Sequence, residues 1–321
     1  MLLIEDKLYQ KIYTKLNKNI IEITNSKRTI VNEAVKDLVE GGGKKLRPFL
    51  MFLAASFGDD YDKDKLIQLG SGIELLHMAS LVHDDIIDDA DLRRGKESAQ
   101  KKFGKKEAVF IGDFLLSKTF DIFFDYLDID VLKKMNKHLR LLCEGEIEQS
   151  EKRYELQIGV RDYYRRIRHK TALLFALSSY LGGYVSGIRG KKLNILYKLG
   201  LEIGMAFQIQ DDLLDFEGDE NNTGKVLARD LKEGIVTLPV ILLMGKNEYN
   251  DKYQIYNKNV LDESVVNDII TDVKESDVLK ESREILLVFI RRVEKYMDRL
   301  PNNRAKKKLK KLIELQVDRK F

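Results

Sequence analysis

The most regular patterns in the chain are two stretches in which apolar residues recur every three or four positions. The first covers residues 66–89 (LIQLGSGIELLHMASLVHDDIIDD), and the second covers residues 194–216 (NILYKLGLEIGMAFQIQDDLLDF). Neither stretch alternates with the period of two that is typical of a strand. Both are apolar on most sides, so each predicts a long helix at the centre of a large bundle.

The remaining sequence contains few residues that would interrupt a helix. Only 3 prolines occur in 321 residues, and long runs are rich in Leu, Lys, Glu and Ile. These residues favour helices, so we predict an all-α fold. No Ser/Pro-rich linker divides the chain, and residues 1–321 are expected to form a single domain. Residues 247–276, the least apolar stretch, are expected to form short helices and loops at the surface. The Lys-rich segment 304–311 (RAKKKLKK) is expected to be a solvated helix face, with a membrane or phosphate contact as the less favoured alternative.

Composition narrows the class of protein. Hydrophobic residues make up 44% and aromatic residues 9%, which allows a sizeable core and excludes a disordered or fibrous chain. The 56 Lys and Arg against 52 Asp and Glu leave a net charge of +4, which gives no indication of nucleic-acid binding. Cys143 is the only cysteine, so it has no disulfide partner within the chain, and we expect it to be a buried small residue. The sequence contains no apolar stretch typical of a signal peptide or a membrane-spanning helix, and a cytoplasmic protein is expected.

The strongest chemical signal is a DDxxD motif at the end of the first predicted helix, formed by Asp84, Asp85 and Asp88. Residues four positions apart share a helix face, so Asp84 and Asp88 point together while Asp85 lies about 100° around the helix. Two carboxylates about 5 Å apart repel by roughly 3 kcal/mol at an effective dielectric near 20, so a counter-ion is expected. Oxygen ligands favour Mg²⁺, which binds substrate phosphates alongside one or two carboxylates.

A second copy of the motif closes the other predicted helix, where Asp211, Asp212 and Asp215 lie 127 positions after the first motif. Two such clusters predict two walls of one cleft with metal ions between them, rather than two unrelated acidic helix ends. A site for diphosphate also needs cations. The candidates are Lys44, Lys45 and Arg47 in the segment GGGKKLRP (41–48), Arg93 and Arg94 after the first motif, Lys170 beside Thr171, and Lys225 after the second motif.

The order of these motifs resembles that of the trans-polyprenyl diphosphate synthases. The matching segments span residues 39–239 and are GGGKKLRP, HMASLVHDDIIDDADLRRG, GDFLL (112–116), KTA (170–172), FQIQDDLLD and DLKEGIVTLP. The resemblance is greatest to medium- and long-chain members, hexa- to nonaprenyl synthases and heptaprenyl-type catalytic subunits. It implies an all-α bundle of the isoprenoid synthase type around a deep central cavity. It also implies a homodimer that condenses isopentenyl diphosphate with an allylic diphosphate.

The resemblance further implies roles for individual residues. The catalytic residues would be Lys170 and the six aspartates, of which Asp84, Asp88 and Asp211 resemble direct ligands of three Mg²⁺ ions, while Asp85, Asp212 and Asp215 resemble water-mediated partners. The allylic-diphosphate contacts would be Arg93, Lys170, Thr171, Gln208 and Lys225. The isopentenyl-diphosphate contacts would be Lys44, Arg47, His77 and Arg94. The metals and cations would stabilise the leaving diphosphate, the isopentenyl double bond would attack the allylic cation, and pyrophosphate would take the final proton.

The sequence departs from the family pattern near the second motif. Ile235 replaces a frequent diphosphate-binding lysine, and Lys232 is a candidate substitute. Residues 224–230 (GKVLARD) lack the common proline and second glycine but retain Lys225 and Asp230. His83, which directly precedes the first motif, is interpreted as a packing or hydrogen-bonding residue rather than a ligand.

The resemblance implies that product length depends on side chains upstream of the first motif. Ala79 and Ser80 are small where short-chain members of the family tend to carry aromatic residues, and the compact DDIIDDADLRRG lacks the two extra residues of bacterial farnesyl-type enzymes. Both features favour products longer than C20, around C30 to C45, as in quinone side chains. Phe120, Phe123 and Phe124 are candidates for a deeper floor of the product tunnel. Close helix packing is the alternative explanation for the small residues, and a farnesyl or geranylgeranyl product is the alternative outcome.

Other classes of protein explain fewer of the motifs. An HD phosphohydrolase would use His83 and Asp84 but would leave the second DDxxD unexplained. A class I terpene cyclase usually has an Asn/Ser/Glu-type triad at the second motif. Regulatory subunits of heteromeric synthases typically lose the aspartates. The chain could still be the catalytic half of a heterodimer with a small subunit, and membrane contact is expected to be peripheral at most.

Overall fold

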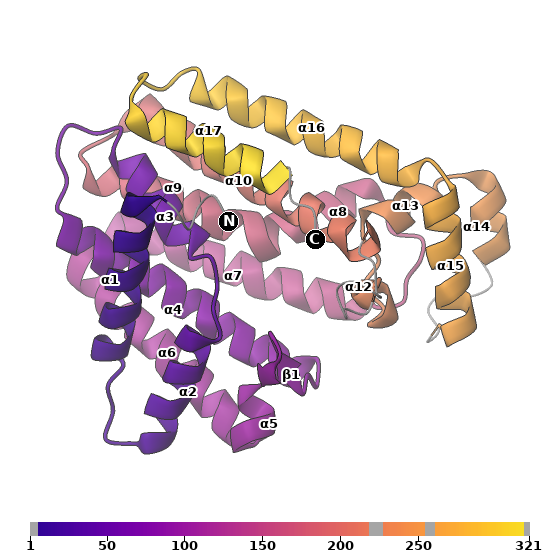
Figure 1. Ribbon diagram of the computed structural model, residues 1–321, viewed down its shortest axis with the longest axis horizontal. Helices are drawn as coiled ribbons and strands as arrows, with labels where there is room; N and C mark the ends of the chain where they lie inside the picture. Colours follow the sequence, from indigo (N-terminus) through magenta and orange to yellow (C-terminus); the bar gives the residue numbers. More distant parts are fainter. Residues whose placement is uncertain (1–5, 218–226, 254–260, 318–321) are drawn as a thin grey trace. The chain divides into compact units, whose positions relative to one another are not determined.

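The computed structural model describes residues 6–217, 227–253 and 261–317, with side chains through residue 314, and it confirms the all-α fold (Figure 1). A two-residue antiparallel hairpin, β1 (Leu92–Arg93) with β2 (Lys96–Glu97), interrupts the helices. The helices are α1 (Lys7–Ile23), α2 (Thr29–Glu40), α3 (Leu46–Ala55), α4 (Lys63–Ile87), α5 (Ala99–Phe103), α6 (Lys105–Tyr126), α7 (Ile129–Glu151), α8 (Val160–Ile167), the π-helix η1 (Arg168–Ala172), α9 (Leu173–Val185), α10 (Gly190–Glu217), α12 (Arg229–Lys232), α13 (Leu238–Met244), α14 (Asn247–Tyr253), α15 (Glu263–Glu275), α16 (Val278–Met297) and α17 (Arg304–Val317).

The chain forms two compact units, which we call unit 1 and unit 2. Unit 1 comprises Met1–Met135 and Ser178–Leu193, and unit 2 comprises Asn136–Leu177 and Asn194–Phe321. The chain passes from one unit to the other within α7, α9 and α10. That residues 1–321 form one domain stays a prediction.

Helix α4 is the centre of unit 1, as the sequence pattern predicts. It begins where the side chain of Asp62 accepts hydrogen bonds from the backbone N–H groups of Asp64 and Lys65, at 2.8 and 3.1 Å. It packs against α1, α3, α5 and α6. At Gly72 an added Cβ would lie 2.7 Å from the ring of Phe123, so only glycine allows α6 to approach this closely. The helix ends at Asp88 within the first aspartate motif.

Helix α10 has the corresponding place in unit 2. Met205, Ile209, Leu213 and Phe216 belong to the buried core of this unit, together with residues of α8, α13, α15 and α16. At Gly204 an added Cβ would lie 2.5 Å from the Cα atom of Ala172. This close backbone approach places η1, which carries Lys170 and Thr171, directly against the helix that carries the second aspartate motif.

The interpretation of residues 247–276 as a surface excursion requires correction. Helices α14 and α15 are short, as expected, but Tyr253, Val265, Ile269 and Val273 are buried in the core of unit 2. The last three lie four positions apart, so a single stripe of α15 faces the core. Few apolar residues suffice because they share one helix face.

The prediction that Cys143 is buried is wrong, because this side chain is exposed on α7. Gly145 of the same helix is buried. Two positions along a helix correspond to a turn of about 200°, so Cys143 lies on the side opposite Gly145.

The Lys-rich segment has the expected arrangement. Ala305, Leu309 and Leu312 of α17 are buried, while Lys307, Lys310 and Lys311 are exposed. None of the helices in the described ranges combines the length and the apolar character that crossing a bilayer requires.

The contact at Gly204 leads to a first prediction. Replacing Gly204 with Ala is expected to lower the melting temperature, because the new methyl group would meet backbone atoms that cannot rotate away. Overpacking typically costs about 1–3 kcal/mol, and a contact with fixed backbone falls at the upper end, above the gain of about 1 kcal/mol from the helix propensity of Ala.

Thermal unfolding of the variant and of Gly159→Ala provides the measurement. An added Cβ at Gly159 would lie 3.7 Å from Oδ2 of Asp162, which is an ordinary contact distance. The Gly159→Ala variant therefore serves as the control. Equal melting temperatures for the two variants would contradict close packing at Gly204.

Candidate active site

An open pocket lies in unit 1, between α2, the loop that follows it, α4, the hairpin and α5. Its polar lining includes three of the residues singled out in the sequence as substrate contacts, together with charged residues that were not. These lining residues are Asp37, Lys45, Glu74, His77, Asp85, Arg93, Arg94, Lys96, Glu97 and Lys102.

The glycine-rich segment forms the loop between α2 and α3. Gly42 and Gly43 have φ angles of 80° and 140°, which side-chain-bearing residues rarely adopt. Arg94 donates a hydrogen bond to the carbonyl oxygen of Gly42. A Cβ at Gly43 would lie 2.8 Å from Nη1 of Arg94, so a side chain at this position would displace the guanidinium group. Tyr9 holds the loop from the other end, because its hydroxyl donates to the carbonyl oxygen of Lys44 at 2.7 Å.

The two adjacent lysines of the loop have different environments. Lys44 is exposed, whereas Lys45 is buried and its Nζ lies 3.0 Å from Oε1 of Glu74 on α4. The two side chains of this ion pair are 2% and 8% exposed. The charge of Lys45 is therefore neutralised within the protein, and the ion pair joins the loop to α4. The sequence analysis missed Glu74, although an acid within an apolar helix three positions before His77 was a usable signal.

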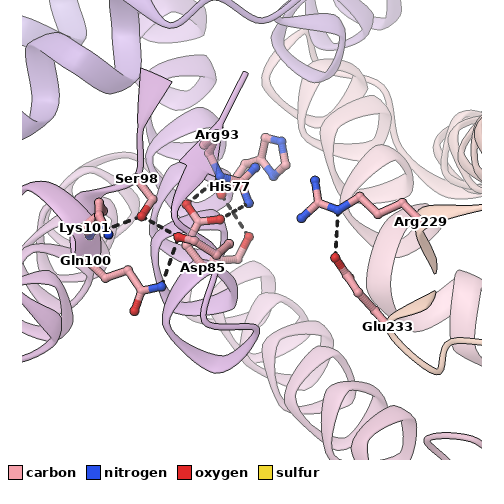
Figure 2. A network of polar contacts seen from close by, with 10 residues as sticks. His77, Asp85, Arg93, Ser98, Gln100, Lys101, Arg229 and Glu233 are labelled. Atoms are coloured by element: carbon pink, nitrogen blue, oxygen red, sulfur yellow. Dashed lines mark hydrogen bonds and ion pairs between the residues drawn. The ribbon is translucent and has the colours of Figure 1, made fainter. Parts of the chain in front are cut away.

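The hairpin presents two adjacent arginines to the pocket. Arg93 pairs with Lys96 across the strands, so Arg94 and Gly95 form the turn, with φ angles of 53° and 78°. Positive φ at both central residues is the mark of a type I′ turn. Arg93 donates from Nε and Nη2 to the two carboxylate oxygens of Asp85, each at 2.6 Å (Figure 2). This bidentate pair balances the charge of a buried carboxylate.

The three aspartates of the first motif differ in exposure, as their helical phase predicts. Asp85 is 3% exposed and lines the pocket, Asp84 is half-buried and Asp88 is exposed. The loop after the motif is anchored at the carbonyl oxygen of Ala90. That oxygen accepts hydrogen bonds from Ser98 Oγ at 2.6 Å and from Gln100 Nε2 at 3.0 Å (Figure 2).

The pKa of His77 reflects the positive charge of the pocket. Its burial lowers the pKa of the imidazole well below the usual value, and the nearby charges of Arg47, Lys45, Arg94 and Arg93 lower this pKa further. The imidazole is therefore neutral at pH 7. The surrounding cations make the pocket a suitable environment for an anionic ligand.

In unit 2, three residues of the predicted site lie in one chain of hydrogen bonds. Thr171 Oγ1 donates to Gln208 Oε1 at 2.6 Å, and Gln208 Nε2 donates to Asp212 Oδ1 at 2.8 Å. The hydroxyl of Tyr163 donates to the other oxygen of Asp212 at 2.7 Å. The buried Asp212 thus has two hydrogen-bond donors. Nothing in the local sequence distinguished Tyr163 from other tyrosines, so its role was missed.

Lys170 lies in η1, a single π-helical turn of a kind often found at functional sites. Its Nζ lies 3.0 Å from Oε2 of Glu146 on α7, 24 positions earlier in the chain. The sequence analysis missed Glu146 as well, because neither residue type nor spacing linked it to the KTA motif.

Carboxylates gather around the second motif in unit 2. Asp215 accepts hydrogen bonds from the backbone N–H groups of Arg229 and Asp230, at 3.2 and 3.3 Å. Burial, followed by the charges of Asp212, Asp215 and Glu233, raises the pKa of Asp230 to about 8. Burial also raises the pKa values of Asp212 and Asp215. The positive charges of Arg166, Arg229 and Lys170 lower these pKa values but do not offset burial, so a cation would stabilise the ionised forms.

Oxygen donors of this kind fit a hard divalent cation such as Mg²⁺. No group of three or more His, Cys, Asp or Glu converges on one point within the ranges that the structure describes. A cation would therefore take the remaining ligands from water and substrate phosphate, which is the mode of binding that Mg²⁺ favours.

The remaining predicted residues have the following environments. Arg47 is half-buried at the start of α3, and His83 lies on α4 with Nε2 3.4 Å from Asp113. Ile235 is half-buried, and Lys232 is exposed. Asp211 is half-buried on α10. Lys225 lies outside the described residues.

The candidate chain-length residues all belong to α4 and α6. Ala79 is buried, and Ser80 donates from Oγ to the carbonyl oxygen of His77 at 2.9 Å. Phe123 is fully buried against Gly72, whereas Phe120 is half-buried with its ring 5.9 Å from that of the exposed Phe124.

Comparison with known proteins identifies the family. A profile of the polyprenyl synthetase family matches residues 28–273. The chain is 33% identical over 325 residues to heptaprenyl diphosphate synthase component 2 of Bacillus subtilis (strain 168), covering 99% of this chain and 93% of that protein. It is 34% identical over 229 residues to octaprenyl diphosphate synthase of Escherichia coli (strain K12), covering 71% of each chain.

Among solved structures, heptaprenyl diphosphate synthase from Staphylococcus aureus superimposes with a TM-score of 0.93 at 30% identity, covering 98% of this chain and 99% of that one. These relatives confirm the resemblance in the motifs and the isoprenoid synthase type of helical fold. The chain therefore belongs to the polyprenyl synthetase family and is a prenyl-transferring enzyme.

Proposed function

We propose that the chain condenses isopentenyl diphosphate with an allylic diphosphate to form a trans-polyprenyl diphosphate longer than C20. The cationic pocket around the neutral His77 in unit 1 is the observation that carries this proposal. The heptaprenyl and octaprenyl names of two relatives support the long product. A farnesyl or geranylgeranyl product is the alternative.

Isopentenyl diphosphate would bind to Lys44, Arg47, His77 and Arg94. Lys45 is assigned to the internal ion pair with Glu74 instead, because its charge is already neutralised. The neutral imidazole of His77 can donate one N–H, while the guanidinium groups can bind two phosphate oxygens at once. The hydrogen bond from Arg94 to the loop carbonyl would hold that guanidinium group in place before the substrate arrives.

The allylic diphosphate would bind to Arg93, Lys170, Thr171, Gln208 and Lys225. The hydrogen bonds from Thr171 through Gln208 to Asp212 support this role, because they determine which way the amide of Gln208 points. Ile235 cannot contribute the positive charge of the lysine that it replaces. The exposed Lys232 is the proposed substitute.

Mg²⁺ would be held by Asp84, Asp88 and Asp211, with Asp85, Asp212 and Asp215 acting through water, and three ions are expected with substrate. When bound, Mg²⁺ neutralises charge on the leaving diphosphate. The bond between the allylic carbon and the diphosphate oxygen breaks with both electrons going to oxygen. The isopentenyl double bond then forms the new carbon–carbon bond, and a proton passes to the released pyrophosphate, so no protein nucleophile is needed.

Product length would depend on α4 and α6. The small side chains of Ala79 and Ser80 would leave room for the growing prenyl chain beside α4. Phe123 contacts this helix at Gly72, about three turns before the first aspartates, and would form the floor. Its complete burial supports this assignment, because a rigidly packed ring can stop an apolar chain.

A homodimer is the proposed assembly. Val109, Phe110 and Phe124 of α6 are 39%, 61% and 66% exposed, and apolar groups this exposed on one helix favour association. Two relatives are named as component 2 of a synthase, so a heterodimer with a small subunit is the second candidate. Gel filtration of the isolated chain together with an activity assay would separate the two assemblies.

A cytoplasmic location stays a prediction from the sequence.

Product analysis tests the proposed reaction. Purified protein with Mg²⁺, labelled isopentenyl diphosphate and farnesyl diphosphate is expected to yield a ladder ending at or above C30, because small residues line α4. The prenyl alcohols would be separated by chromatography after dephosphorylation. Termination at C15 or C20 would contradict the long product. No product from any allylic starter would contradict activity of the isolated chain.

The proposed floor leads to a second test. Phe123→Ala and Phe120→Ala are expected to lengthen the final product by at least one isoprene unit, because each removes a ring from α6. The exposed Asp125 on the same helix offers a control, and Asp125→Ala should leave the product unchanged. Truncating the fully buried Phe123 costs about 3–5 kcal/mol, so Phe123→Leu provides a milder variant if Phe123→Ala does not fold. An unchanged ladder in the Phe120 and Phe123 variants alike would contradict a floor at this position.

The buried ion pair leads to a third test. Glu74→Gln is expected to raise KM for isopentenyl diphosphate about tenfold, equivalent to about 1.4 kcal/mol, because the uncompensated charge of Lys45 would displace the loop. Initial rates measured while each substrate is varied should show a smaller change in KM for the allylic substrate. Glu97→Gln, which changes an exposed acid of the same pocket, is the control. Equal changes in both KM values would indicate a general loss of structure instead.

A further inference from the structure

The positive charge of the chain is concentrated at its C-terminal end. Residues 291–321 contain twelve Lys and Arg but only four Asp and Glu, a net charge of +8. The whole chain carries only +4, so residues 1–290 have a net charge of −4. The small net charge of the whole chain gives no indication of a polyanionic partner, but the C-terminal segment by itself is strongly basic.

Two helices of unit 2 carry this segment. Helices α16 and α17 are joined by residues 298–303 and lie side by side (Figure 1). Both turn an apolar face toward α10, so their outer faces point away from the core of the unit. The inner faces meet α10 around a small apolar pocket, which is lined by residues that include Ile203, Phe207, Leu286, Val293, Leu312 and Ile313.

The outer surface of these helices forms what we call the basic face. It consists of seven exposed cations, namely Arg291, Lys295, Arg299, Arg304, Lys307, Lys310 and Lys311. Arg291, Lys295 and Arg299 follow one another at intervals of four, and residues 304, 307 and 311 repeat at three and four, so each set forms a ridge. Three exposed acids, Glu294, Asp298 and Glu314, lie in the same stretch and leave the exposed surface with a clear excess of positive charge.

The burial of the apolar side of α17 determines how this face can bind. Leu309, Leu312 and Ile313 are packed within unit 2, so α17 cannot insert an apolar face into a bilayer. The available contact is electrostatic, between Lys and Arg side chains and negatively charged head groups. Leu287, which is 44% exposed one turn before Arg291, adds one apolar side chain beside the cations.

We propose that the basic face docks the enzyme on an anionic lipid surface. This inference rests on the proposed function, because a prenyl chain longer than C20 is too apolar to leave readily into water. A polybasic surface beside an anionic leaflet strengthens binding about fivefold for each Lys or Arg that comes near it. Single-stranded nucleic acids are held by exposed aromatic side chains that stack on bases, and the one aromatic residue among residues 291–314, Tyr296, is half-buried.

Vesicle flotation with the full chain tests the proposal without any substrate. The protein is expected to float with vesicles made of equal parts phosphatidylglycerol and phosphatidylcholine, and not with vesicles of phosphatidylcholine alone. Binding should be lost at high salt, because ionic screening weakens contacts between exposed charges. Equal binding to both kinds of vesicle would overturn the proposal.

Charge-neutralising variants locate the contact. Replacing Lys307, Lys310 and Lys311 with Gln is expected to weaken binding to the anionic vesicles about a hundredfold, since three cations are lost. Replacing the exposed Lys7, Lys11 and Lys18 of α1 with Gln makes the same change in net charge and should leave vesicle binding within about twofold of the unmodified protein. Similar weakening by both triple variants would overturn the assignment to the basic face.

Two further measurements separate this proposal from its alternatives. Binding to a DNA duplex that is lost in the Lys307, Lys310 and Lys311 variant, without binding to vesicles, would assign the face to nucleic acid and overturn lipid docking. Prenyl transfer in detergent should be the same for this variant and the unmodified protein. If neither protein transfers prenyl groups, the proposed function is refuted. The vesicle measurements would still test whether the basic face binds anionic lipid.

Discussion

Charged groups at the ends of buried helices are the constraint on which the arrangement of both units depends. Most residues of helices α4 and α10 are buried or half-buried, yet each helix ends at a DDxxD motif. A carboxylate removed from water is costly unless it has a partner. Arg93 supplies that partner for Asp85, and the hydrogen bonds of Tyr163 and Gln208 supply it for Asp212. The hairpin and η1 are thereby placed beside the aspartates.

The same constraint accounts for the cationic pocket of unit 1. Four positive side chains act on the half-buried His77, and part of this charge is balanced internally. Glu74 balances Lys45 and Asp85 balances Arg93, whereas Arg94 contacts a neutral backbone carbonyl. An anionic substrate would supply the missing negative charge. Internal ion pairs therefore maintain the shape of the pocket, while Arg94 is suited to recognition of the substrate.

Helix positions and the aspartate motifs could be predicted well because they depend on local spacing. The periods of three and four indicated α4 and α10, and a turn of about 100° per residue correctly separated Asp85 from Asp84. The pairing partners could not be predicted in this way. Glu74 lies 29 positions from Lys45, and Tyr163 lies 49 positions from Asp212, so only the folded chain brings them together. Cys143 was misplaced because composition does not reveal which side of α7 faces the core.

The sequence by itself determined the helical class, the two aspartate motifs and membership of the family, since each depends on residue identity and short spacing. Tertiary structure alone decided which of two adjacent lysines is neutralised, which acid holds Lys170, and that residues of α15 belong to a core. It also brought the outer faces of α16 and α17 together as one basic face. These features depend on contacts between distant segments, whose energies appear only when packing excludes water and gives each charge a particular neighbour.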